Sequence, residues 1–181
     1  MNLKNHRYGV VKQRLIVLSL MALLGTCTAT RSLADDNAGL KVAKFDIDAT
    51  PPIGFRMAYD HVIRTEELGL RCRGIVIIGS GKPIVLCAVD WIGIGNGGQD
   101  AFRETLAKAA GTSPNRVAVH TLHQHDAPRC DFTAEQLLHG AGVSDLGPHD
   151  GSFARGIVKA FVSCRFRGHA ESIGRVAYRD W

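Results

Sequence analysis

Two runs of β-branched and apolar residues, joined by a turn segment, constrain the fold of this chain most. LGLRCRGIVIIG and KPIVLCAVDWIGI lie within residues 68–94, and GSGKP joins them. Val and Ile favour extended backbone, whereas Gly and Pro interrupt it, so the pattern predicts a β-hairpin. The second run is apolar almost throughout, which predicts a central strand covered on both faces.

The segments around this hairpin predict an α/β domain. Residues 40–52 alternate up to a double proline and predict a strand followed by a loop. Residues 96–111 have helical spacing, and residues 112–122 return to a strand pattern. Further elements are predicted as a short helix at 132–140, a helix at 151–168 and the start of a strand at 171–181. We therefore predict a layered mixed β-sheet with flanking helices, incomplete at the C-terminus.

The first 34 residues have the three parts of an export signal. A basic segment precedes the apolar run LIVLSLMALLG, and the small residues Ser32 and Ala34 stand where a signal peptidase reads. An apolar run of about ten residues is too short to cross a bilayer as a helix, which takes about 20. We predict a signal peptide over residues 1–34, cleavage near Ala34 and a periplasmic or secreted protein with no stable transmembrane anchor. An uncleaved anchor and a lipoprotein attached through Cys27 are the alternatives.

The net charge of +5 belongs to this leader and not to the domain at residues 35–181. The leader has no Asp or Glu, and the rest of the chain carries 17 basic and 17 acidic residues. This balance predicts no nucleic-acid partner. The oligomeric state stays open. GIGNGG lacks the order of a P-loop or dinucleotide motif, and no GxSxG elbow supports a serine hydrolase.

Four cysteines follow the leader: Cys72, Cys87, Cys130 and Cys164. An exported protein can form disulfides, and Cys72 and Cys87 flank the predicted hairpin. The sequence does not choose among the three possible pairings. Buried free thiols are an equally good interpretation.

The stretch VAVHTLHQHDAP, residues 117–128, places three histidines within six positions at the end of a predicted strand. If the extended conformation persists, His123 and His125 point to the same side. Two imidazoles at this spacing can serve one divalent metal, or a metal and its bound water, where a strand gives way to a loop. His120 lies at an odd offset from His123, so we expect it in the core or behind a ligand. A hydrogen-bonded surface cluster is the alternative.

Three blocks resemble, in order and spacing, the N-terminal part of the catalytic domain of the neutral, non-lysosomal ceramidase family. HQHDAP is similar to the HTHSGP element of that family, and FDIDATPPIGFRMAY is similar to its early strand and loop. The hairpin at 68–94 resembles its following strand pair, which carries an Asp at its end. The resemblance covers roughly residues 40–130. It implies a divergent bacterial member, with residues 35–181 as the N-terminal portion of a ceramidase-like catalytic domain.

The resemblance implies a zinc amidase, in which Zn²⁺ activates water against the amide of a ceramide. It assigns His123 as a zinc ligand and places His125 beside the zinc-bound water and the lipid-like amide substrate. Neutral imidazole is a good zinc ligand, and a second imidazole can move a proton. Asp90, at the end of the second apolar run, is expected to orient an imidazole, with a loop cap or a turn that precedes a helix as the alternative.

The sequence departs from the family pattern at two places. DAP stands where the family has SGP, so Asp126 adds a negative charge beside the expected metal, as a ligand or as a turn former. The family's further zinc ligands, a His, a Glu and a Tyr, find no matching segment before Trp181, which implies a truncated or degenerate copy. The available substitutes are His139, His149, Asp131, Asp145 and Asp150.

Three hypotheses about function follow from these observations. The first is a zinc-dependent hydrolase of a ceramide-like amide. The second is a catalytically silent fragment of the same fold. The third is a metal- or lipid-binding module that uses the histidines without hydrolysis.

Overall fold

The computed structural model describes residues 39–164, residue 166 and residues 171–172. The predicted signal peptide, and all of the predicted last strand except residues 171–172, lie outside the described residues. Within the part that is described, no helix has the length and apolar character needed to cross a membrane.

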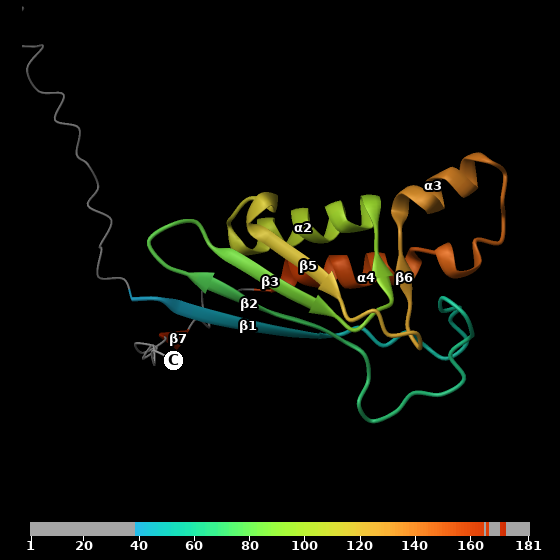
Figure 1. Cartoon of the computed structure of the whole chain (residues 1–181), viewed down its shortest axis with the longest axis horizontal. Coiled ribbons are helices and arrows are strands. Elements are labelled where there is room, and N and C mark those ends of the chain that lie inside the picture. The colour runs from blue at the N-terminus through green and yellow to red at the C-terminus, as the bar shows by residue number, and fades with distance from the viewer. Residues whose placement is uncertain (1–38, 165, 167–170, 173–181) are drawn as a thin grey trace, which may run out of the picture. The chain divides into compact units, whose positions relative to one another are not determined.

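A mixed β-sheet forms the centre of the fold (Figure 1). Its strands are β1 (Lys41–Asp48), β2 (Arg71–Ile78), β3 (Ile84–Val89), β5 (Val117–Thr121) and β7 (Glu171–Ser172), in the order β5–β3–β2–β1–β7. The β2–β3 pair is antiparallel, which confirms the predicted hairpin, and β1 is antiparallel to both of its neighbours. Strand β5 runs parallel to its partner, β3.

Helices connect and cover the strands. They are α2 (Asn96–Ala110), α3 (Phe132–Gly140) and α4 (Ser152–Ala160). Helix α2 carries the chain from β3 to the parallel strand β5 and ends at Gly111, whose left-handed φ of 68° suits a residue without Cβ. The prediction of a layered mixed sheet with flanking helices is confirmed. The helix predicted for 151–168 ends earlier, at Ala160, and passes into a 3₁₀ turn at Phe161–Ser163.

The core lies between the helices and one face of the sheet. Val76, Val85 and Val89 point into it from β2 and β3 and are fully buried. Phe102 of α2 packs against Phe161, with the two ring centroids 5.4 Å apart. The strand residues that enter this core follow the two-residue period of a β-strand.

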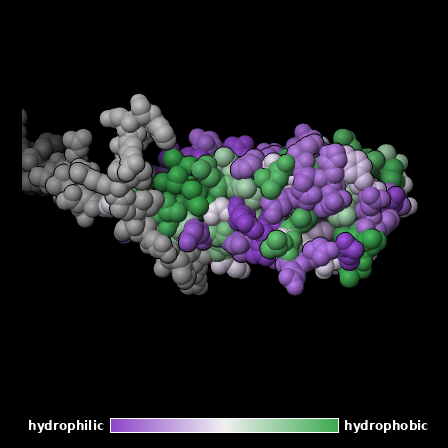
Figure 2. Space-filling view, turned by 60° about the horizontal axis from the view of Figure 1, so that its bottom comes forward, coloured by the Kyte–Doolittle hydropathy of each residue, from purple (hydrophilic) through white to green (hydrophobic). Residues whose placement is uncertain are grey.

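The opposite face of the sheet is open in the described part of the chain, so the prediction that β3 is covered on both faces is wrong. Ile84 and Leu86 are 38% and 41% exposed. The reason is that α2 and α4 lie on the same side of the sheet (Figure 1). Figure 2 shows hydrophobic residues gathered at one end of the described part of the chain and mainly hydrophilic residues over the middle of this view. His120 is exposed and lines a shallow hollow with Leu86 on this face, so its expected place in the core is also wrong.

Cys72 and Cys87 do meet across the hairpin, as free thiols. Both are fully buried, and their Sγ atoms are 3.6 Å apart. The hydrogen bond with Cys87, together with burial, holds the pKa of the Cys72 thiol far above its usual value. The buried-thiol interpretation describes this pair.

A second, two-stranded sheet follows the end of β3. It pairs β4 (Gly93–Ile94) with β6 (Arg129–Cys130) in parallel. The sequence analysis did not predict these short strands. Strand β4 comes just after Trp91, and β6 comes just after the histidine segment. Their pairing therefore holds the histidine segment beside the residues that follow β3.

Candidate functional site

The histidine segment is a loop that follows β5 and lies beside the residues after β3. Strand β5 ends at Thr121, after which the Leu122 N–H donates to the Val89 carbonyl and the His123 N–H donates to the Trp91 carbonyl, each at 3.1 Å. At His123 the backbone turns left-handed, with φ of 57°. A residue with a Cβ adopts that conformation at a cost of about 1–2 kcal/mol. The extended conformation therefore does not persist, and strand alternation does not explain how the two rings are arranged.

The two imidazoles nevertheless lie side by side. The ring centroids of His123 and His125 are 5.6 Å apart, and both residues are exposed. Nδ1 of His123 is 2.9 Å from the Ile92 carbonyl oxygen. A carbonyl only accepts, so Nδ1 carries the proton of the neutral ring and Nε2 keeps its lone pair. This is the arrangement in which metal-binding histidines are usually held.

Tyr59 covers His125, a contact that the sequence analysis missed. The two ring centroids are 5.1 Å apart, and the Ala58 N–H donates to the Ala127 carbonyl at 3.3 Å. Tyr59 is itself 65% exposed. It belongs to the FDIDATPPIGFRMAY block, but nothing in its spacing marks it as a neighbour of a histidine 66 positions away.

Asp90 stands at the end of the hairpin, as predicted, but its contacts are with backbone. Its Oδ2 accepts from the Arg71 N–H at 2.9 Å. Its own carbonyl accepts from the side chain of Gln124 at 2.9 Å. The carboxylate thus accepts from the first N–H group of β2. A role for Asp90 toward an imidazole stays a prediction.

The proposed substitute ligands are mostly engaged elsewhere. Oδ1 of Asp131 accepts from the Thr133 and Ala134 N–H groups and its Oδ2 from Asn96, while Asp145 and Asp150 accept from the Gly147 and Ser152 N–H groups. His139 lies in the last turn of α3, and Nδ1 of His149 is buried with no hydrogen-bond partner among the described residues. Among the residues that the structure describes, no three His, Cys, Asp or Glu side chains form a group that could hold a metal ion. A catalytic zinc typically takes three protein ligands, so the pair fits as part of a zinc site that the described residues do not complete.

Asp131 gives a prediction about stability and pH. Burial acts to raise its pKa, but hydrogen bonds from Ala134, Asn96 and Thr133 outweigh this and leave the pKa below its usual value. Its carboxylate therefore stabilises the fold above the unfolded pKa of about 3.9, and the effect is lost as pH falls through the lower folded pKa. Asp131→Ala, which removes the N-cap of α3, should cost about 0.5–2 kcal/mol at pH 7 in urea unfolding.

The neutral variant Asp131→Asn is the matched control, because it keeps an acceptor for the helix N–H groups. It should lose less stability than Asp131→Ala, and its stability relative to the wild type should improve as the pH falls below about 4. A cost for Asp131→Ala that does not change with pH would contradict the assignment of this carboxylate as an ionised cap.

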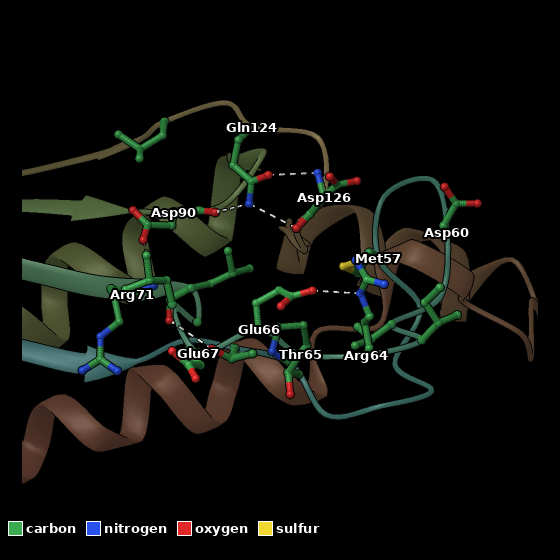
Figure 3. A pocket seen from close by; sticks show the side chains of 18 of the residues that line it. Met57, Asp60, Arg64, Thr65, Glu66, Glu67, Arg71, Asp90, Gln124 and Asp126 are labelled. Atoms are coloured by element: carbon green, nitrogen blue, oxygen red, sulfur yellow. Dashed lines mark hydrogen bonds and ion pairs between the residues drawn. The ribbon is translucent and has the colours of Figure 1, made fainter.

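A hollow of about 1390 Å³ lies beside the histidine loop (Figure 3). Leu122, Gln124 and Asp126 contribute to its lining, whereas the intervening residues His123 and His125 do not. The segment at residues 60–71 forms much of the rest and brings charges of both signs, including Asp60, Arg64 and Glu66. The loop therefore separates the hollow from the two imidazoles.

The described fold is similar to part of solved ceramidase structures. One similar solved structure is a neutral ceramidase from Pseudomonas aeruginosa, with a TM-score of 0.50 and 17% identity over 74% of this chain and 22% of that chain. Another is a ceramidase complexed with C2, with a TM-score of 0.48, 18% identity and the same two shares. No family model and no curated protein matches the chain.

The comparison with the Pseudomonas aeruginosa structure supports a partial and divergent ceramidase-like fold. The chain spans about 22% of the length of that structure. At 17% identity the similarity concerns the fold, so metal, substrate and activity must be argued from this chain's own residues.

Proposed function

We propose that this chain carries the histidine part of a zinc amidase site that acts on a ceramide-like lipid. The observation that carries the proposal is the state of His123. Its Nδ1 is hydrogen-bonded to the Ile92 carbonyl, so the lone pair of Nε2 is free to bind a metal. A second imidazole lies beside it. Zinc, when bound, supplies a water of pKa about 7 and polarises the carbonyl of the amide.

The chain's own residues have distinct tasks in this proposal. His123 binds the metal through Nε2. His125, whose ring lies 5.6 Å from that of His123, holds the substrate or moves a proton between the water and the leaving amine. Tyr59 limits the positions open to the His125 ring by packing against it. Besides His123, two further protein ligands are required for the three that a catalytic zinc typically takes.

The proposal extends to the location of the protein. The leader supports export, with cleavage near Ala34, to the periplasm or the outside of the cell. A metal- or lipid-binding role without hydrolysis is the second candidate, and the two-histidine geometry would serve it equally.

Hydrolysis of a short-chain ceramide with a fluorescent acyl group tests the proposal. The full chain, loaded with Zn²⁺, should release the fluorescent acid, and His125→Ala should lower the rate about 100-fold or more, since a positioned acid–base group contributes at least that factor. His120→Ala, on the open face of the sheet, is the matched control and should leave the rate unchanged. Equal rates in His125→Ala and the wild type would contradict the role of His125. Zinc binding without any hydrolysis would favour the second candidate.

A further inference from the structure

We infer that Gln124, the residue between the two histidines, is a positioning residue that holds the histidine pair in its binding geometry. The inference has two parts. The bracing of the loop by Gln124 stands on hydrogen bonds alone, whereas its consequence for zinc rests on the proposed function.

The carboxamide of Gln124 closes the histidine loop with three hydrogen bonds (Figure 3). Nε2 donates to the Asp90 carbonyl at 2.9 Å and to the Asp126 carbonyl at 3.1 Å. Oε1 accepts from the Asp126 N–H at 2.9 Å. The side chain therefore pairs with both backbone groups of Asp126, much as a neighbouring strand would, and anchors them to the end of β3.

These contacts call for a carboxamide of this length. Gln offers two N–H donors and one carbonyl acceptor, and all three are used. Glu has the same length but no donor, and its carboxylate would face two carbonyl oxygens. Met has a similar length and no comparable polar group.

Gln124 belongs to one bracing system with His123. Three consecutive carbonyls after β3 hold the loop: Asp90 binds the Gln124 side chain, Trp91 binds the His123 N–H, and Ile92 binds the His123 ring. His123 sits in the costly left-handed conformation between these anchors. If the Gln124 contacts are removed, the loop can relax toward extended backbone and carry the ring away from Ile92.

The inference is tested on the full chain with Gln124→Met and Gln124→Glu. The control is Gln99→Met, because Gln99 also donates from Nε2 to a backbone carbonyl, that of Val119 in β5, and not to the loop that holds His123 and His125. Two quantities are measured: the affinity for Zn²⁺ alone, by competition with a chromophoric chelator, and the protonated nitrogen of the His123 ring in the metal-free protein, by ¹⁵N NMR.

Both Gln124 variants should bind Zn²⁺ about 10- to 100-fold more weakly, the usual loss when a group that supports a metal ligand is removed. Their His123 rings should no longer be protonated mainly at Nδ1. Gln99→Met should match the wild type in both measurements. If Gln124 only stabilised the fold, thermal stability would fall in all three variants, and the protonated nitrogen of the His123 ring would stay the same.

Failure of this inference and failure of the proposed function give different results. A wild-type chain that binds no Zn²⁺ refutes the proposed site, and the ring measurement then decides the bracing role on its own. An unchanged His123 ring in Gln124→Met would overturn the inference. If Gln124→Met does not fold, the same criterion applies to Gln124→Glu, which keeps the length and one acceptor.

Discussion

Replacing Trp91 with alanine is expected to lower the free energy of unfolding by about 3–5 kcal/mol, the usual cost of removing a large buried aromatic side chain. Trp91 is fully buried, and its ring centroid lies 5.9 Å from that of Phe102 and 5.9 Å from that of Phe153. Its Nε1–H also donates to the Ala49 carbonyl at 3.1 Å. The substitution leaves a cavity and an unpaired carbonyl where β3 leads into the candidate site. Urea unfolding followed by circular dichroism measures the effect.

Two further variants separate the contributions to this loss. Trp91→Phe keeps an aromatic ring in the core and should cost less than Trp91→Ala, mainly through the lost hydrogen bond and the smaller ring. Val162→Ala removes a side chain that is 68% exposed, and it should change stability by no more than about 0.5 kcal/mol. A loss below about 1 kcal/mol for Trp91→Ala would show that this side chain does not hold the layers together.

The local part of the fold could be predicted from the sequence. The hairpin of β2 and β3 has a turn segment between two β-branched runs, and α2 ends at the glycine that the pattern indicated. These features depend on residues close together in the chain. The open face of the sheet could not be predicted in the same way, because an apolar residue such as Leu86 gives the same pattern whether or not another layer covers it. The short β4–β6 pair depends on a contact between segments far apart in sequence.

The juxtaposition of the two histidines could be predicted from the sequence, but the contacts that support them could not. The spacing of His123 and His125 was enough to place them together, although the backbone that does so is left-handed and not extended. Gln124 gave no signal, since its partner Asp90 is 34 positions earlier and is bound through its backbone carbonyl. The backbone carbonyls of Trp91 and Ile92 also hold the loop, but every residue has such a carbonyl, so the sequence does not show which ones are used. From residue type alone, a carboxylate that caps a helix, such as that of Asp131, cannot be distinguished from one that binds a metal.

Replacing His123 with alanine should remove the capacity of the chain to retain Zn²⁺. The imidazole is the group whose second nitrogen is fixed by a backbone carbonyl, so it is the best prepared of the described donors. The substitution removes the zinc ligand that the proposed function assigns, and a catalytic zinc typically takes three protein ligands. The fold should survive, because His123 is exposed and contributes little to the core. Circular dichroism would confirm that the variant is folded before its metal content is compared.

His120→Ala is the matched control for this substitution, since His120 is also exposed but lies on the open face of the sheet, in β5. It removes one imidazole from the same segment without touching the proposed site. Its metal content should equal that of the wild type.

The most direct test is therefore the zinc content per chain, measured by elemental mass spectrometry after the wild type, His123→Ala and His120→Ala have been exposed to Zn²⁺ and freed of excess metal. A zinc site built on His123 predicts close to one zinc per chain in the wild type and in His120→Ala, and almost none in His123→Ala. Equal zinc in all three proteins, or none in the folded wild type, would contradict it.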